Sequence, residues 1–184
     1  VINALSDVEH PCQILADLLT IHEVKGRLTD LTITFIGDCN NNVAHSLALA
    51  SAMLGISFRC VSPKTYCLDK TILSKVSMFK DASITETTNL KEALKGTDVI
   101  VTDTWISMGD EGEEDVRLKV FEEFQVNTDL MKLAKPDAMF LHCMPVYRGN
   151  EVTSYVVDGE QSFMYQEAEN RLHAQKALLV HLLS

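Results

Sequence analysis

The sequence has little positive charge and no long apolar run. Lysine and arginine together number 16 against 26 aspartates and glutamates, which gives a formal net charge of −10. Nucleic acids and anionic membranes are bound by clustered basic side chains, so this balance argues against either partner. No apolar run approaches the roughly 18 residues that cross a bilayer. The start, VINALSDVEHPCQ, lacks a basic segment followed by an apolar one, so we expect neither a membrane segment nor a signal peptide.

Cysteines are few and form no binding pattern. The five are irregularly spaced and include no CxxC pair: Cys12, Cys39, Cys60, Cys67 and Cys143. Disulfide frameworks need paired cysteines and structural zinc sites need closely spaced ones, so we expect neither a disulfide nor a metal site. A reducing, cytoplasmic compartment fits this usage best.

The sequence does contain enough apolar material for one core. Hydrophobic residues make up 46% of the chain and charged residues 23%. This balance is typical of a globular protein, and 184 residues suffice for one sizeable domain but are short for two. We therefore expect residues 1–184 to form a single domain.

Short apolar or β-branched runs alternate with longer amphipathic ones from residue 31 onward. The short runs predict five strands, at residues 31–37, 57–62, 83–87, 98–103 and 138–142. The longer runs predict helices at residues 43–54, 68–79, 90–95, 114–124, 129–134 and 165–183, with one more at residues 10–25. This alternation is typical of an α/β fold in which helices cover a parallel sheet.

The expected strand ends carry polar residues. Strand one runs into GDCNNN, strand four into DTWISMG and strand five into HCMP. Ligands bind beyond the carboxyl ends of parallel strands, so these segments can line one pocket. Gly37 is not followed by the other glycines of GxGxxG, so we expect no nucleotide cofactor. Asn40, Asn41 and Asn42 are either turn and helix-capping residues or amides that bind a small zwitterion.

Asp103 follows the apolar run VIVT, and a turn of Ser107, Met108 and Gly109 comes shortly after it. An aspartate in this place is commonly a cap or turn residue. Combined with the Ser-x-Gly turn, it can instead clamp an amino acid: the carboxylate pairs the α-ammonium group, and hydroxyl and backbone N–H groups bind the α-carboxylate. The acidic stretch that follows, residues 109–124, is expected to be a solvated loop and helix face.

Two helices add further polar groups. HPCQ places His10 and Gln13 three residues apart, near one face and near the positive end of the first helix. The last helix contains EAENRLHAQKALL, in which Arg171 follows Glu167 by one turn. These residues have ordinary interpretations as caps, surface residues or ion pairs. Arg171 can also neutralise a phosphate or polarise a carbonyl group.

The segment HCMP raises the question of a cysteine nucleophile. Neighbouring residues of a strand point to opposite faces, so we predict that His142 and Cys143 lie on opposite sides and form no nucleophile–base pair. This argues against a cysteine hydrolase. We expect Cys143 to be a neutral contact and His142 to be a structural neighbour.

As a set, these motifs resemble the second half of ornithine carbamoyltransferases. HPCQ, GDCNNNVAHS, DTWISMG, HCMP followed by RGNEV, and EAENRLHAQKALL match that family in order and approximate spacing, over essentially the whole chain. The resemblance implies a Rossmann-like, three-layer fold with about five parallel strands. It implies transfer of the carbamoyl group from carbamoyl phosphate to the δ-amine of L-ornithine, which gives citrulline and phosphate. It also implies no cofactor, and a homotrimer for the complete enzyme.

The resemblance further implies roles for individual residues. The implied carbamoyl phosphate contacts are His10, Pro11, Cys12, Gln13, Cys143, Met144 and Arg171. The implied ornithine contacts are Asn42, Asp103, Ser107 and Met108. The implied catalytic residues are His10, Cys143 and Arg171. Leucine is usual in the family at the position of Met144.

The family's carbamoyl phosphate domain, with its Ser-Thr-Arg-Thr phosphate loop, has no counterpart in this sequence. We therefore expect the chain to be the ornithine-binding half, with a linking helix at residues 10–25 and a return helix at residues 165–183, and to be inactive alone. Two alternatives stay open. One is a carbamoyltransferase for another amine, such as putrescine or N-acetylornithine, although Asp103 favours a free α-amino acid. The other is a non-catalytic amino-acid-binding domain.

Overall fold

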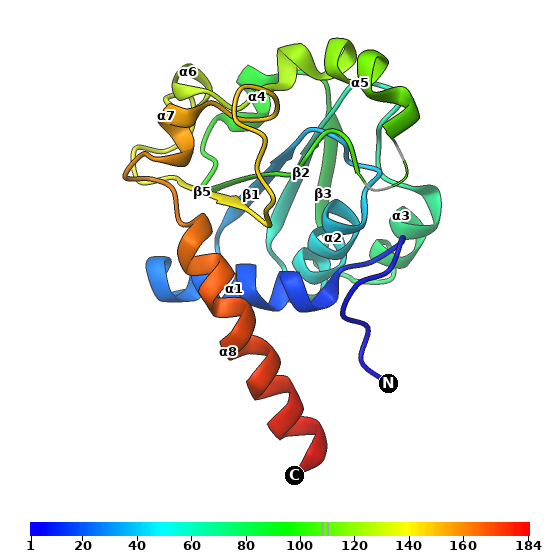
Figure 1. Ribbon diagram of the computed structural model, residues 1–184. Helices are drawn as coiled ribbons and strands as arrows, with labels where there is room; N and C mark the ends of the chain where they lie inside the picture. Colours follow the sequence, from blue (N-terminus) through cyan, green and yellow to red (C-terminus); the bar gives the residue numbers. More distant parts are fainter. Residues whose placement is uncertain (108, 110) are drawn as a thin grey trace.

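Five parallel strands form the centre of the computed structural model, which describes residues 1–107, 109 and 111–184 (Figure 1). The strands are β1 (Thr32–Ile36), β2 (Ser57–Val61), β3 (Ser83–Thr87), β4 (Val99–Thr102) and β5 (Met139–His142). They lie in the order β3-β2-β1-β4-β5, and each neighbouring pair is parallel. The five predicted strands are therefore confirmed, with ends that differ from the expected ones by at most one residue.

Helices connect the strands and flank the sheet. Their bounds are α1 (Pro11–Lys25), α2 (Asn42–Leu54), α3 (Lys70–Val76), α4 (Leu90–Leu94), η1 (Glu111–Glu113), α5 (Glu114–Phe121), η2 (Glu122–Phe124), α6 (Thr128–Met131), α7 (Ser154–Val157) and α8 (Met164–Leu183). Helix α3 begins two residues later than predicted because the side chain of Asp69 caps it, accepting a hydrogen bond from Thr71 N, and it ends at Val76, three residues early. The sequence did not predict α7, a single turn without a helical apolar period.

The strands send alternate side chains into two apolar cores. Ile33 and Phe35 of β1 pack with residues of α1, α2 and α3 on one face. Ile100 of β4 and Phe140 of β5 pack on the other face, together with Leu94 of α4. Both faces of the sheet are thus covered, which explains why the central strands are apolar throughout. The expected α/β fold with a helix-covered parallel sheet is confirmed.

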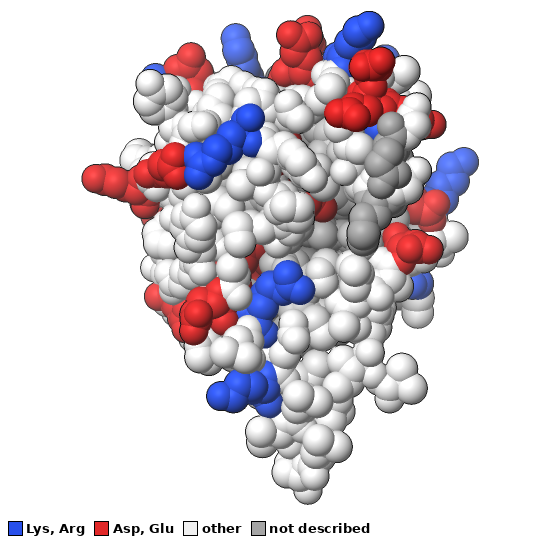
Figure 2. Space-filling view, in the orientation of Figure 1, with Lys and Arg blue, Asp and Glu red and all other residues white. Residues whose placement is uncertain are grey.

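Helix α8 crosses α1 and then leaves the body of the protein (Figure 1). At the crossing, Asn170 Nδ2 donates a hydrogen bond of 3.0 Å to Thr20 Oγ1. Beyond the crossing, the helix carries few charged side chains (Figure 2). Its exposed apolar residues are Leu172, Leu179, Val180, Leu182 and Leu183. Within the described residues, neither α8 nor any other helix is long and apolar enough to cross a membrane.

Candidate active site

Three polar loops meet at the carboxyl ends of β1, β4 and β5, which are neighbours in the sheet. From β1 the chain moves outward to β2 and β3, and it then returns to place β4 on the other side of β1. Open α/β sheets bind ligands in the crevice at such a switch of direction. The structure therefore brings together the strand ends that the sequence singled out, at the place where this fold forms a site.

Asp103 lies at the centre of these loops and is only 8% exposed. One carboxylate oxygen accepts hydrogen bonds from Cys143 Sγ at 3.1 Å and from Thr104 N at 2.7 Å. The other accepts from Asn41 Nδ2 at 3.0 Å. Asp103 therefore connects the loops after β1, β4 and β5 and is more than a local cap.

Asn41, which the sequence did not distinguish from its neighbours, serves two purposes. Its Oδ1 accepts from Ala44 N at 2.8 Å and caps α2, while its Nδ2 binds Asp103. Asn42 begins α2 and donates its side-chain N–H to the carbonyl oxygen of Ser6 at 2.8 Å. The ornithine contact assigned to Asn42 by resemblance stays a prediction, and Asn41 is an additional residue of this site.

The thiol of Cys143 is held in its neutral form. Burial and the neighbouring Asp103 carboxylate raise the pKa of Cys143 well above its usual value, because both disfavour a thiolate. A cysteine nucleophile needs the opposite shift, toward a lower pKa. This environment agrees with a neutral contact.

The prediction that His142 and Cys143 lie on opposite sides is wrong. One ligand atom each of Asp103, His142 and Cys143 lies within 4.8 Å of the others. The strand alternation fails here because β5 ends at His142, and the backbone turns at Met144, which has a φ of 56°. A nucleophile–base pair is absent for a different reason: the thiol donates to Asp103, and both imidazole nitrogens of His142 have other partners.

The surroundings of His142 fix its tautomer. Nδ1 accepts a hydrogen bond of 3.0 Å from Met144 N, so the ring proton is on Nε2, which lies 3.2 Å from Glu151 Oε1. Glu151 is fully buried and also accepts from Tyr147 N at 2.6 Å. A metal ion at Asp103, His142 and Cys143 would have to displace these bonds and a thiol proton, so the cluster favours hydrogen bonding over metal binding.

A second part of the site lies where α1 and α8 cross. His10 precedes α1, and its backbone N–H donates to Ser46 Oγ at 2.8 Å. Gln13 is completely buried, and its Nε2 donates to both Asp17 Oδ1 at 2.8 Å and Glu167 Oε1 at 2.7 Å. The other oxygen of Glu167 accepts from His142 N at 2.9 Å and so connects this part to β5.

Burial controls the protonation of these groups. It raises the pKa of Asp17 to about 6, and burial together with the nearby Asp17 raises the pKa of Glu167 well above its usual value. Both shifts disfavour the charged form of these acids. Burial, assisted by the positive charge of Arg171, lowers the pKa of His10, which favours a neutral imidazole.

Three polar groups near this crossing lack partners within the described residues. His10 Nδ1 and Gln13 Oε1 are buried and make no hydrogen bond. Arg171 is half-buried, and among the contacts of the described residues it has no hydrogen bond or ion pair. Its positive charge lowers the pKa of both His10 and Asp17, which places it within electrostatic range of them. A ring nitrogen, an amide oxygen and a guanidinium near this crossing therefore have no hydrogen-bond partner in the described part of the chain.

The remaining predicted residues lie around these groups. Pro11 is the first residue of α1, and the Cys12 side chain turns away toward the carbonyl oxygen of Asn3, at 3.5 Å. Met144 packs against the apolar core on the α4 side of the sheet. Ser107 is half-buried in the loop after Asp103. Met108 lies outside the described residues.

The expectation of a fully solvated acidic segment at residues 109–124 is corrected in part. Arg117 of α5 is 4% exposed and forms a buried ion pair with Asp38. Its guanidinium also donates to the carbonyl oxygen of Trp105 and lies 5.1 Å from the ring centre of Tyr66. These contacts hold α5 over the carboxyl end of β1, and α5 buries the face that bears Arg117.

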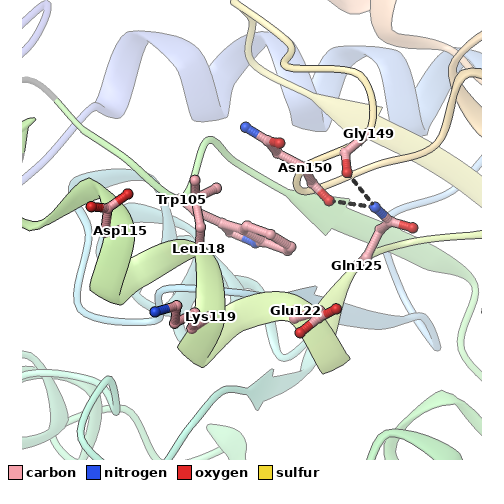
Figure 3. Close-up of a pocket in the computed structure, with 8 residues that line it drawn as sticks. All are labelled: Trp105, Asp115, Leu118, Lys119, Glu122, Gln125, Gly149 and Asn150. Atoms are coloured by element: carbon pink, nitrogen blue, oxygen red, sulfur yellow. Dashed lines mark hydrogen bonds between the residues drawn. The ribbon is translucent and has the colours of Figure 1, made fainter.

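A separate hollow of about 600 Å³ lies beside α5 (Figure 3). Its lining residues are Trp105, Asp115, Leu118, Lys119, Glu122, Gln125, Gly149 and Asn150. Gln125 closes one side by donating to the carbonyl oxygens of Gly149 and Asn150, at 2.7 and 2.8 Å. Among the residues that the structure describes, none of the site residues predicted from the sequence lines this hollow.

Comparison with known proteins assigns this architecture to a family. Residues 29–182 match the family model described as aspartate/ornithine carbamoyltransferase, Asp/Orn binding domain. The chain is 51% identical to the ornithine carbamoyltransferase of Bifidobacterium longum subsp. infantis, covering 99% of this chain and 59% of that protein. It is 52% identical to that of Caldicellulosiruptor saccharolyticus, with 98% and 59% covered. The chain thus spans about three fifths of the length of these relatives.

Solved structures are similar over the same extent. Ornithine carbamoyltransferase from Pyrococcus furiosus superposes with a TM-score of 0.89 at 46% identity, covering 96% of this chain and 57% of that one. Anabolic ornithine carbamoyltransferase from Campylobacter jejuni gives 0.91 at 39% identity, covering 99% and 61%.

Proposed function

The chain belongs to the aspartate/ornithine carbamoyltransferase family, and on that basis we propose that it is the ornithine-binding part of an ornithine carbamoyltransferase. The reaction would transfer the carbamoyl group of carbamoyl phosphate to L-ornithine, giving L-citrulline and phosphate. The observation that carries this proposal is the set of unpartnered polar groups at the crossing of α1 and α8, beside the Asp103 network.

Those groups match the chemistry of carbamoyl phosphate one by one. The ligand has a carbonyl oxygen that accepts hydrogen bonds, an amino group that donates them, and an anionic phosphate. His10 Nδ1 can supply a donor, Gln13 Oε1 is an acceptor, and Arg171 supplies the positive charge. A buried polar atom without a partner is unfavourable, so a ligand that satisfies both His10 and Gln13 gains from each contact.

The acidic side of the site suits ornithine. The carboxylate of Asp103 can pair an α-ammonium group, and Ser107 in the following loop can bind the α-carboxylate, as predicted from DTWISMG. A second carboxylate, as in aspartate, would be repelled here, whereas the side-chain amine of ornithine is attracted.

In this proposal the residues of the chain orient the reactants and stabilise charge. The δ-nitrogen forms a bond to the carbonyl carbon, the bond from that carbon to the phosphate oxygen breaks, and the proton that the nitrogen loses passes to the departing phosphate. Negative charge that develops on the carbonyl oxygen is stabilised by His10 and Arg171. Cys143 contacts the reacting groups as a neutral thiol, without forming a covalent bond, and the Asp103 clamp holds the amine in line.

The proposal extends to the complete protein. The relatives are longer than this chain, so we assign the phosphate loop to a preceding domain and expect residues 1–184 to be a single domain that is inactive alone. The exposed apolar end of α8 would pack against that domain. Five unpaired thiols fit a cytoplasmic location. A homotrimer is proposed for the complete enzyme, and light scattering would measure it.

Citrulline formation tests the function directly. The complete enzyme should form citrulline from L-ornithine and carbamoyl phosphate, and the 184-residue chain should not. Putrescine and N-acetylornithine, supplied in place of ornithine, should react at least about a hundredfold more slowly, because neither presents a free α-ammonium and α-carboxylate to the clamp. If either amine were turned over faster than ornithine, that amine would be the proposed substrate instead. Binding of ornithine without any turnover would favour a non-catalytic amino-acid-binding domain.

Two variants of the complete enzyme locate the amino-acid clamp. Asp103→Asn removes the charge that pairs the α-ammonium group and should raise the KM for ornithine about a hundredfold. Asp81→Asn makes the same chemical change on an exposed residue before β3 and should leave the KM unchanged. Equal KM values for the two variants would contradict the assignment of Asp103.

A further inference from the structure

The orientation of the Gln13 side chain is determined by two carboxyl groups that the proposed reaction does not use. Both N–H bonds of the Gln13 amide point at Asp17 and Glu167, at 2.8 and 2.7 Å. All three residues are at least 99% buried, so water cannot replace these partners. With both N–H groups engaged, Oε1 points away from the pair and is left without a partner.

The opposite orientation of this amide is unfavourable. A flipped Gln13 would present Oε1 to both carboxyl groups, and each of them would need a proton to donate. Burial raises the pKa of Asp17 only to about 6, so at neutral pH the oxygen of a flipped amide would face the Asp17 carboxylate. Glu167 cannot rotate away to relieve this, because its second oxygen accepts from the backbone N–H of His142.

We propose that Asp17 and Glu167 are specificity-determining positioning residues, which fix Gln13 so that its Oε1 accepts a hydrogen bond from the amino group of the transferred carbamoyl group. This inference rests on the proposed function. An acceptor at this position selects N–H over a methyl group of similar size, because a methyl group leaves Oε1 buried and unpaired. The pair thereby makes the site prefer a carbamoyl phosphate over an acyl phosphate such as acetyl phosphate.

Two stable phosphonates measure this preference without requiring turnover. Phosphonoacetamide carries the amino group, and acetonylphosphonate carries a methyl group in its place. Isothermal titration of the complete enzyme should give a Kd for phosphonoacetamide at least about tenfold lower than that for acetonylphosphonate, the effect of one buried hydrogen bond. If the unmodified enzyme binds neither compound, the proposed function itself fails, and this outcome is separate from those below.

Glu167→Gln is the decisive variant. The backbone N–H of His142 requires an oxygen, so the new amide must place its NH₂ group toward Gln13, where it meets another donor. Neither orientation of the Gln13 amide then suits both Asp17 and the new amide, so Gln13 is no longer fixed and the roughly tenfold preference for phosphonoacetamide should disappear. The KM for ornithine should change less than twofold. Glu169→Gln makes the same substitution on the same helix, at a side chain that is 68% exposed, and should keep the full preference.

A double-mutant cycle separates positioning from a general structural role. Gln13→Leu should abolish the preference by itself, and adding Glu167→Gln to it should change nothing further, because the pair acts through Gln13. If each substitution instead reduced the preference independently, so that the two reductions multiplied in the double variant, the inference would be overturned. A Glu167→Gln enzyme that keeps the tenfold preference would also overturn it. Should Glu167→Gln lose its cooperative melting transition, Asp17→Asn replaces it. That variant should reduce the preference at least threefold, and an unchanged preference would equally refute the inference.

Discussion

The buried acid at Asp17 should make the protein less stable as the pH rises. Its pKa is raised by burial from 3.8 to about 6 in the folded chain. The carboxyl group therefore contributes stability that is fully present below pH 3.8 and is lost as the pH rises through about 6. Because the pKa is raised, the folded state binds more protons than the unfolded state between pH 3.8 and about 6, so the unfolding free energy falls as the pH rises.

The variant Asp17→Asn removes this titration and keeps a side-chain oxygen for Gln13. A shift of about 2 pKa units corresponds to about 3 kcal/mol, of which about 2 kcal/mol is lost between about pH 4.5 and 7.5. The unmodified chain should therefore lose about 2 kcal/mol of unfolding free energy relative to the variant across this range. The titration of Glu167 increases this difference between the unmodified chain and the variant. Part of the rise in the pKa of Glu167 comes from the charge of Asp17, which the variant lacks.

Urea unfolding followed by far-ultraviolet circular dichroism at four pH values between about 4.5 and 7.5 measures this difference. The exposed control Asp81→Asn should differ from the unmodified chain by less than about 0.5 kcal/mol at each pH. A difference between Asp17→Asn and the unmodified chain that is constant with pH, or that grows in the opposite direction, would refute a buried acid with a raised pKa.

Three further predictions concern other contacts of the site. Arg117→Met leaves the buried Asp38 without its partner and should lower the unfolding free energy by about 3 kcal/mol in urea, whereas a smaller loss is expected when Asp38→Asn is added. Asn41→Ala removes the cap of α2 and should cost about 1 kcal/mol of stability; in the complete enzyme it should also raise the KM for ornithine by releasing Asp103. Cys143 should react with iodoacetamide at least about tenfold more slowly at pH 7 than a free cysteine, as measured by mass spectrometry of the modified peptide, because its thiol is neutral; fast labelling would contradict the assigned protonation.

The fold was predictable because its determinants are local. Apolar runs such as VIVT before Asp103 and MFLH at β5 are long enough for a strand and are too short for a helix. The alternating amphipathic segments then leave a parallel sheet as the simplest arrangement. Short elements did not follow from this reasoning: α7 has four residues and no helical period, and its Val156 and Val157 pack in the apolar core that contains Ile100 and Phe140.

The site was predictable only in part. The strand-end motifs predicted the convergence around Asp103, because the carboxyl ends of parallel strands share one edge. The prediction that His142 and Cys143 lie on opposite sides failed because side chains alternate between faces only along extended backbone, and β5 ends at His142. The expectation that His142 is a structural residue agrees with the structure, since both ring nitrogens have partners within the fold.

The acid pair shows where sequence reasoning reaches its limit. Gln13 and Asp17 are four residues apart on α1, a spacing at which Gln and Asp side chains meet, so half of the pair had a local signal. Glu167 lies 150 residues from Asp17 and reaches it only because α8 crosses α1, a packing that no local period specifies. Whether Glu167 is a surface acid or a buried acid with a raised pKa is therefore decided by that crossing. A substitution that displaces α8 without touching either acid should consequently lower the pKa values of both, since it readmits water to the pair.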